Sequence, residues 1–331
     1  MQKMFSDAME CTRTDDRCRL VRARLNGPTM GTRWSVSCDV DPQGDVQALE
    51  RSLAAVVERV DRQMSPWKAD SDLSRLNRAA GNQWIDLPEE MVAVLERALE
   101  VSRRSGGAFD PGVGALVNAW GFGAVRDVPD PVAIRAVASM PGRAAHEVLE
   151  LDAKAGRVRK HAPIVLDLCA IAKGYGVDRM AAVVRDYGIE HALVALDGEL
   201  RACGTQASGE GWAVALESPR FGVRAAHGVI ELADLAVATS GDYRRSVHVG
   251  AVRLSHTMDA RRAAPVHNDL ASVTVLAPDC MSADAWATAL LVAGAVDGPA
   301  LAQRMGLEAL FLLRRADTLV EIGLGRFGMK T

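Results

Sequence analysis

Asp284 and Thr288 stand four positions apart in an apolar run, SADAWATALLVAGA (282–295), that has the pattern of a helix. Residues four apart share one face of a helix, so the carboxylate and the hydroxyl would project together. Hard oxygen ligands of this kind suit Mg²⁺, which completes its shell with water and phosphate oxygens. Ser282 is a natural N-cap at a helix start, where unpaired N–H groups also favour phosphate. Taken alone, however, the spacing favours a structural role, in which Asp284 offsets the helix dipole and Thr288 bonds back to a carbonyl.

A second polar cluster, DLCAIAKGYG (167–176), links an apolar strand predicted over 164–168 to a helix predicted over about 174–186. The small residues between Asp167 and Lys173 would let the backbone approach a ligand, while Lys173 offers a point charge to a phosphate. A structural interpretation explains these residues equally well, with Asp167 as a helix cap and Lys173 as a solvated residue of the first turn.

Two further clusters follow apolar segments. Thr239 and Ser240 precede Gly241, which indicates either two hydroxyls beside converging backbone donors or a turn that bonds to its own backbone. His256 and Asp259, in the stretch HTMD, could supply a base and an orienting partner, although a lone histidine is more often structural.

Trp120, Gly121 and Phe122 place aromatic rings beside flexible backbone in a chain with only 5% aromatic residues. Such rings could flank a planar ligand. Without other information, a core corner built around Trp120 is the better interpretation.

The elements that must position these clusters alternate between strand and helix patterns. Apolar residues at helical spacing predict helices over 46–64 and 89–101, and a further helix follows near 299–305. Alternating residues around Gly27 and Gly31 predict paired antiparallel strands. With no internal repeat or linker, the chain is predicted to form one α+β body over residues 20–331, with antiparallel sheets and packed helices. The polar, aperiodic residues 1–19 are expected to form a mobile tail.

Composition excludes several classes of function. The 39 basic and 42 acidic side chains nearly cancel, so neither nucleic acid nor an anionic membrane is an expected partner. The chain lacks a GxGxxG, P-loop, HExxH or GxSxG motif, which argues against the corresponding enzymes. No apolar run reaches about 18 residues and the N-terminus lacks a signal-peptide pattern, so no transmembrane segment is expected. As given, the chain is expected in the cytoplasm, or in the periplasm if a leader was removed.

Taken in order, the clusters resemble the ApbE-like flavin transferases (FAD:protein FMN transferases) from about residue 24 to the end. Seven matches in the family order are highly specific, and together they favour the chemical interpretation of each cluster. The matching stretches are PTMGT (28–32), SPWKADSDLSRLN (65–77), FDPGVGALVNAWGFG (109–123), LDLCAIAKGYGVD (166–178), VATSGDYRR (237–245), HTMDARRAAPV (256–266) and MSADAWATAL (281–290). The resemblance implies an α+β fold of the ApbE-like, T-fold-like type.

The resemblance also implies FAD as a substrate and Mg²⁺ as a cofactor. Mg²⁺ would be held by Asp284, Thr288 and a backbone carbonyl near Ala170. The residues expected to contact FAD, to which we add two hydroxyls from the cluster before Gly241, are Met30, Trp67, Trp120, Gly121, Phe122, Asp167, Lys173, Met258, Thr239 and Ser240.

In the reaction that the resemblance implies, a threonine or serine hydroxyl of an acceptor protein, within a short small-residue motif, attacks the FMN phosphorus of FAD. AMP leaves, and a phosphoester joins FMN to the acceptor. His256, Asp259 or Asp242 is the candidate group that positions or deprotonates the hydroxyl. The alternatives are a Mg²⁺-dependent FAD pyrophosphatase, a non-catalytic FAD-binding accessory protein, against which Asp284 and Thr288 argue, and a redox flavoenzyme.

The chain departs from the family pattern at three loops. Cys169 and Ala170 replace two glycines, 195–199 (ALDGE) replaces Asn-x-Gly-Gly-Asp, and 259–264 (DARRAA) replaces Asp-Pro-x-Thr-Gly. These changes make loops near the expected site less flexible or alter their charge. The choice of acceptor could therefore differ from the family norm.

Overall fold

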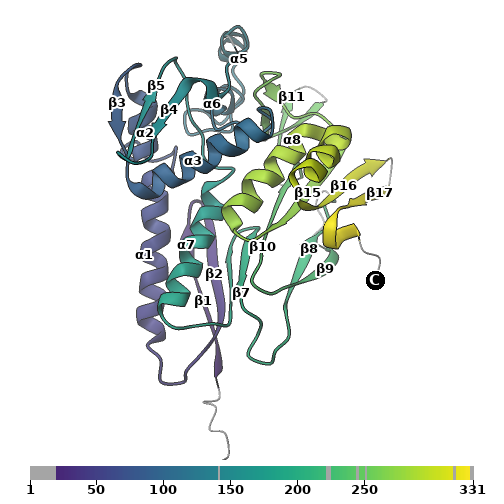
Figure 1. The fold of residues 1–331 in the computed structure, drawn as a ribbon. Helices are drawn as coiled ribbons and strands as arrows, with labels where there is room; N and C mark the ends of the chain where they lie inside the picture. The colour runs from purple at the N-terminus through teal and green to yellow at the C-terminus, as the bar shows by residue number, and fades with distance from the viewer. Residues whose placement is uncertain are drawn as a thin grey trace, which may run out of the picture.

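An eight-stranded antiparallel sheet runs through the centre of the fold (Figure 1). The computed structural model describes residues 20–140, 142–220, 225–243, 246–249, 252–315 and 318–328, and the predicted tail (1–19) lies outside them. In sheet order the strands are β1 (Val21–Thr29), β2 (Thr32–Val40), β6 (Ala192–Leu196), β7 (Glu199–Cys203), β10 (Ala236–Gly241), β15 (Leu270–Ala277), β16 (Glu308–Arg315) and β17 (Thr318–Gly323). The α+β fold class predicted from the sequence is therefore confirmed.

Four smaller sheets complete the described strands. One has three strands, in the order β3 (Trp84–Asp86), β5 (Arg157–Lys160) and β4 (Leu149–Asp152). The other three are two-stranded ribbons: β8 (Trp212–Glu217) with β9 (Ala226–Leu232), β11 (Ser246–Val249) with β12 (Val252–Ser255), and β13 (Met258–Asp259) with β14 (Ala264–Pro265).

The helices lie mainly on one side of the large sheet (Figure 1). They are α1 (Val46–Met64), α2 (Asp72–Arg78), α3 (Glu89–Arg104), α4 (Gly114–Ala119), α5 (Pro131–Ala138), α6 (Ala145–Val148), α7 (Ala172–Asp186), α8 (Cys280–Met305) and the 3₁₀ turn η1 (Gly325–Gly328). The helices predicted over 46–64 and 89–101 are present as α1 and α3. The two helices predicted over 282–295 and 299–305 are the two parts of α8, which breaks at Gly294 (φ +89°).

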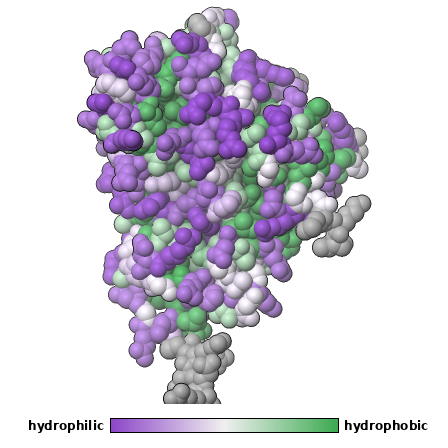
Figure 2. Space-filling view, in the orientation of Figure 1, coloured by the Kyte–Doolittle hydropathy of each residue, from purple (hydrophilic) through white to green (hydrophobic). Residues whose placement is uncertain are grey.

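The core has two principal layers. Apolar residues of α1 and α7 pack against β2 and β6, while α8 packs against β15 and β16. On the sheet's other face, the β8–β9 ribbon covers β7 and β10 through Trp212, Val214 and Leu232. Hydrophilic side chains predominate on the outward face of α1 and α3, as their amphipathic sequences require (Figure 2).

The start of α8 differs from the sequence prediction. Asp279, rather than Ser282, is the N-cap and accepts a hydrogen bond from the Ser282 backbone N–H at 2.8 Å. The carboxylate of Asp178 accepts the preceding N–H groups of Cys280 and Met281, each at 2.9 Å. The first N–H groups of the helix are thus already occupied, so the helix start itself offers no phosphate site.

Helix α8 is also the one described helix long and apolar enough to cross a membrane by length and composition. Its position argues against a membrane span, because much of its apolar stretch is buried against β10, β15 and α7. Such burial is typical of a core helix.

The apolar segment 164–168 is not a strand, contrary to the prediction. It is extended and makes only one isolated bridge, between Val165 and Val113. The side chain of Asn77 replaces a partner strand: its amide donates to the Leu166 carbonyl at 2.9 Å and its oxygen accepts the Leu166 N–H at 2.8 Å. The segment therefore satisfies its backbone groups without joining a sheet.

The crossing of α7 and α8 depends on Gly174. A Cβ at this position would lie 2.3 Å from the Cys280 carbonyl oxygen, which belongs to backbone and cannot rotate away. Gly174→Ala is therefore expected to lower the free energy of unfolding by about 2–3 kcal/mol in urea denaturation. Gly176→Ala is the matched control on the same helix, because its Cβ would meet only the tip of Leu196 at 3.3 Å. Equal losses in the two variants would contradict this account of the crossing.

Candidate active site

A cavity of about 1030 Å³ lies where the turn of β1–β2, the end of α1, the starts of α7 and α8 and the β8–β9 ribbon meet. Its volume is in the range of sites for large ligands. Twelve of the residues singled out in the sequence line it: Met30, Trp67, Phe122, Asp167, Ala170, Lys173, Thr239, Ser240, His256, Met258, Asp284 and Thr288. Segments far apart in the sequence thus contribute to one space.

A charged cluster of Asp284, Glu199 and Lys173 forms part of the cavity wall, with both carboxylates buried and the lysine partly exposed. The Lys173 ammonium donates to Glu199 Oε1 at 2.6 Å. The carboxylate of Asp284 accepts the Gly174 N–H at 3.0 Å, which ties α8 to the first turn of α7. The second oxygen of Glu199 is buried and has no hydrogen-bond partner among the described residues. With all three groups ionised, the cluster carries one net negative charge.

Burial and mutual repulsion set the protonation of this cluster. Burial and the neighbouring Glu199 raise the pKa of Asp284 to about 7, while Lys173 and the Gly174 N–H act in the opposite direction. Burial also raises the pKa of Glu199, and Lys173 offsets part of this increase. Burial lowers the pKa of Lys173, but Glu199 and Asp284 outweigh it, so the net pKa is raised and the lysine stays charged. A nearby cation would relieve the repulsion between the two carboxylates.

Hydroxyl groups extend the polar wall from Asp284 along α8 and β10. Thr288 lies one turn after Asp284, and its Oγ1 is 2.9 Å from Ser240 Oγ. Thr239 Oγ1 is 2.8 Å from Thr274 Oγ1 on the neighbouring strand. The hydroxyls of Ser240 and Thr288 are therefore brought together, whereas Thr239, the preceding residue of β10, bonds to Thr274 instead; all three predicted residues line the cavity.

Glu199 is a site residue that the sequence analysis noted but assigned no role. Strands β6 and β7 are joined by Asp197 and Gly198, with Asp197 in the left-handed region at φ +56°. A two-residue Asp-Gly turn of this kind fixes the register of a hairpin, which pairs Leu196 with Glu199. The turn therefore places the carboxylate of Glu199 beside the Lys173 ammonium. In the sequence, the signal that could have identified Glu199 was an acidic residue directly after an Asp-Gly pair.

Asp167 belongs to a tight turn before α7. Its Oδ1 accepts the Cys169 N–H at 2.7 Å, and its own N–H donates to the Pro111 carbonyl at 2.8 Å. Burial raises the pKa of Asp167, and the Cys169 N–H lowers it. Asp167 is not the cap of α7, which begins at Ala172 after Ile171. The turn brings the backbone at Ala170 to the cavity wall.

Aromatic and sulfur-containing side chains line the mouth of the cavity. Met30 occupies the tight β1–β2 turn with φ +46°, a left-handed conformation that non-glycine residues rarely adopt. Trp67 is 54% exposed at the rim. The rings of Phe122 and His256 meet edge to face with centroids 6.3 Å apart. The mouth therefore offers apolar surfaces to a planar ligand and an imidazole beside them.

Two of the three candidate bases lie elsewhere. Asp242 does not line the cavity, because Arg314 holds both its oxygens at 2.6 and 2.7 Å. Asp259 is likewise absent from the cavity lining, and its buried carboxylate is paired with Arg261 at 2.9 and 3.0 Å. Of the three candidates, only His256 lines the cavity.

Trp120 and Gly121 also lie outside the main cavity. Trp120 ends α4 with a buried indole nitrogen that has no hydrogen-bond partner in the described structure. Gly121 instead lines a shallow groove beside the cavity mouth. Neither residue lines the main cavity, and their expected contact with FAD stays a prediction.

The cavity has further polar lining residues that the sequence analysis did not single out. Lys68 lies at the rim and pairs with Glu58 and Asp61, each at 2.8 Å. Tyr243 donates to Glu217 Oε2 at 3.1 Å on another wall. Tyr243 and Glu217 are 26 positions apart, and the partners of Lys68 belong to the preceding helix α1, so no local sequence pattern identifies these pairs.

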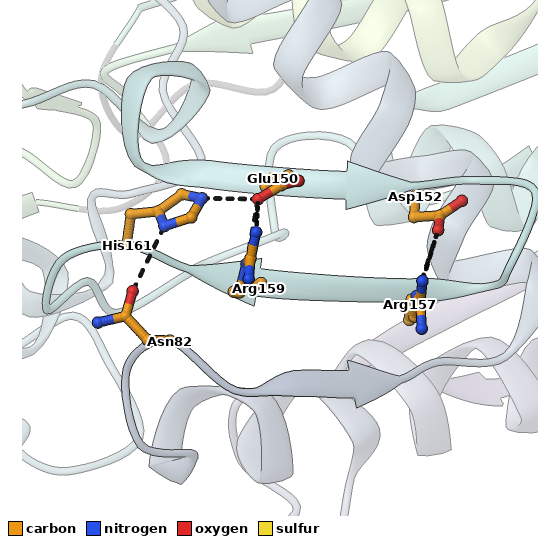
Figure 3. Close-up of polar contacts among 6 residues, drawn as sticks. All are labelled: Asn82, Glu150, Asp152, Arg157, Arg159 and His161. Atoms are coloured by element: carbon orange, nitrogen blue, oxygen red, sulfur yellow. Dashed lines mark hydrogen bonds and ion pairs between the residues drawn. The ribbon is translucent and has the colours of Figure 1, made fainter.

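A second polar cluster, on the β3–β5–β4 sheet, is separate from the cavity (Figure 3). His161 Nε2 lies 2.7 Å from Glu150 Oε2, and Arg159 binds the same carboxylate. Arg157 pairs with Asp152 at 3.1 Å. The charges of this surface cluster satisfy one another, so its histidine has a structural explanation.

Comparison with known proteins gives matches over most of the chain. A model of the ApbE family matches residues 30–311. The FAD:protein FMN transferase of Vibrio cholerae serotype O1 is 34% identical over 311 residues, covering 92% of this chain and 92% of that protein. The FAD:protein FMN transferase of Klebsiella pneumoniae is 31% identical over 296 residues, covering 88% and 85% respectively.

Solved structures agree with the sequence matches. The flavin transferase ApbE from Vibrio cholerae has a TM-score of 0.82 at 33% identity, covering 92% of this chain and 97% of that chain. The Pseudomonas stutzeri flavinyl transferase ApbE in its apo form has a TM-score of 0.83 at 31% identity, covering 96% and 100%. The likeness therefore extends to the whole arrangement of sheet and helices.

Proposed function

This chain belongs to the ApbE family, and we propose that it is a transferase that moves FMN from FAD to a threonine or serine hydroxyl of an acceptor protein, with release of AMP. The observation that carries the proposal is one cavity that joins a buried acidic cluster to an aromatic mouth. Its relatives are named as FAD:protein FMN transferases, which supports FAD as substrate and a protein as acceptor.

The polar end of the cavity fits Mg²⁺. Asp284, the hydroxyl of Thr288 and the backbone carbonyl at Ala170 would hold the ion, and all three residues line the cavity. The described residues contain no group of three or more His, Cys, Asp or Glu side chains suited to a metal. A site with few protein ligands suits Mg²⁺, which keeps water and substrate phosphate oxygens in its shell. The net negative charge of Asp284, Glu199 and Lys173 supports this assignment. When bound, the ion would supply charge stabilisation to the pyrophosphate.

The chain's own residues would position the two reactants. Lys173, which is held by Glu199, would place a fixed positive charge beside the pyrophosphate. Trp67 and Phe122 would flank the flavin at the mouth, and His256 lies beside Phe122. Phosphoryl transfer needs mainly such positioning and charge.

In the proposed step, the acceptor Oγ forms a bond to the FMN phosphorus while the bond from that phosphorus to the bridging oxygen breaks. AMP leaves with the electron pair of the broken bond. His256 is the group proposed to take the hydroxyl proton, because it is the candidate base that lines the cavity.

Mass spectrometry of an acceptor incubated with the protein, FAD and Mg²⁺ tests the proposal. The expected result is an acceptor heavier by one FMN group at a threonine or serine, with one AMP released for each group added. Release of FMN and AMP with an unmodified acceptor would instead identify a pyrophosphatase. FAD that is bound but remains intact would overturn both activities.

A further inference from the structure

Residues 121–140, here called the α4–α5 segment, hold large apolar side chains in solvent. Val125, Val128 and Val132 are 70%, 63% and 68% exposed, and Met140 is also exposed. Helix α5 has no buried residue and stands apart from the helical layer at the top of Figure 1. Scattered exposed apolar residues are ordinary, but several within one short segment indicate an interaction surface.

The first half of this segment is fixed by backbone contacts. The Phe122 N–H donates to the Val117 carbonyl at 3.0 Å, and the Asp130 N–H donates to the Ala119 carbonyl at 2.9 Å. Gly121 (φ +78°) lets the backbone of Val128 pack where a side chain would stand, since a Cβ at Gly121 would lie 2.4 Å from the Val128 carbonyl carbon. Val125 and Val128 therefore lie on a loop held by backbone contacts and Val132 on helix α5, which limits the entropy lost on binding.

The start of the segment is continuous with the cavity. A groove of about 450 Å³ is lined by Trp67 and residues 121–127. Trp67 and Phe122 also line the main cavity, so they form a common edge between groove and cavity. A polypeptide lying in the groove would have its neighbouring residues at the cavity mouth.

The charge of the segment indicates the chemistry of its partner. Arg126 and Arg135 balance Asp127 and Asp130, and Arg126 is ion-paired with Asp130. The segment therefore has no net charge that would attract an anionic membrane or a highly charged protein. An uncharged, partly apolar polypeptide fits it best.

We propose that the α4–α5 segment is the docking surface for the acceptor protein, and that it binds an uncharged apolar stretch of that protein next to the modified threonine or serine. The inference rests on the proposed function, because that reaction requires a polypeptide to reach the cavity. Val125 lines the groove, and Val128 and Val132 continue the exposed apolar surface beyond it. A polypeptide that lies in the groove and extends over these two valines would present the acceptor hydroxyl across the edge formed by Trp67 and Phe122.

The test uses Val128→Glu, Val132→Glu and the double variant of the full chain. The probe is a synthetic peptide with one threonine among Gly, Ala and Ser residues, followed by a stretch of Val and Leu. The double variant is expected to raise the KM for the peptide at least about tenfold, with FAD affinity unchanged. Lysine at both positions should have the same effect, because the lost contact is apolar.

Folding is not expected to fail in these variants. Both side chains are exposed, and Val132 is in the first turn of α5, where a carboxylate is favourable. Val296→Glu is the matched control, since Val296 is 83% exposed on the second part of α8.

The outcomes separate the two proposals. If wild-type protein modifies the peptide and the double variant has the KM of the Val296→Glu control, the docking surface is wrong. The same conclusion follows if sedimentation shows that the double variant only abolishes self-association while the KM is unchanged. If wild-type protein cleaves FAD but leaves the peptide unmodified, the proposed transfer fails, and the docking inference that rests on it fails too.

Discussion

Asp284→Asn is expected to reduce Mg²⁺-dependent FMN transfer about 10³-fold and, at the same time, to stabilise the metal-free fold at pH 8. The loss of activity follows from removing the one charged ligand proposed for the ion. Asparagine keeps an oxygen that can accept the Gly174 N–H, so the link between α7 and α8 is preserved. The stabilisation follows from removing a carboxylate that burial and Glu199 disfavour.

The pH dependence of this stabilisation has a definite sign. Because the pKa of Asp284 is raised from 3.8 to about 7 on folding, the folded state binds this proton more tightly than the unfolded state. The free energy of unfolding therefore falls as the pH rises from 3.8 to about 7 and changes no further from this group above that. Asp284→Asn should raise the free energy of unfolding by about 2–4 kcal/mol at pH 8, and by less at pH 5.

Urea denaturation in a chelator at pH 5 and pH 8, together with the mass assay for transfer, measures both effects. Asp45→Asn is a suitable control because Asp45 caps α1 at the surface and asparagine caps equally well. The control should change neither stability nor transfer. Undiminished transfer by Asp284→Asn would overturn the metal assignment.

Lys173→Met is expected to lower the free energy of unfolding by about 3–5 kcal/mol and to abolish transfer. Without the ammonium, the buried carboxylates of Glu199 and Asp284 remain together with no compensating charge. Adding Glu199→Gln to Lys173→Met removes one of these charges, so the double variant should regain most of the lost stability. Transfer should stay low in both, because the positive charge proposed to face the pyrophosphate is missing.

A double-mutant cycle in urea checks this prediction. The two substitutions should show strong coupling, with the double variant more stable than Lys173→Met alone. Additive losses would mean that Lys173 and Glu199 do not act as a pair. Wild-type transfer rates in the double variant would show that the lysine does not contact substrate.

Local sequence patterns predicted the elements whose own residues determine them. Helix α1 matches the predicted range 46–64, because its apolar residues recur at helical spacing and Asp45 caps it. The predicted convergence of Asp284 and Thr288 in a cavity depended on the resemblance as well, since their spacing alone favoured a structural role.

Features set by distant contacts could not be predicted in this way. Segment 164–168 has the composition of a strand, but the side chain of Asn77 occupies its backbone groups. Asp242 was a reasonable candidate base from the sequence alone. In the fold, its carboxylate is bound by Arg314, which is 72 residues away in the sequence. A single sequence specifies such pairs only through the complete fold.

The close crossing at Gly174 has a consequence for how the enzyme meets its ligands. Lys173 comes from α7 and Asp284 from α8, and the glycine between them both admits the α8 backbone and donates a hydrogen bond to Asp284. The lysine and the carboxylate are therefore brought together when the two helices dock during folding. A nucleotide bound there as proposed would meet groups that the fold already holds in place, and would not have to bring two separate helices together.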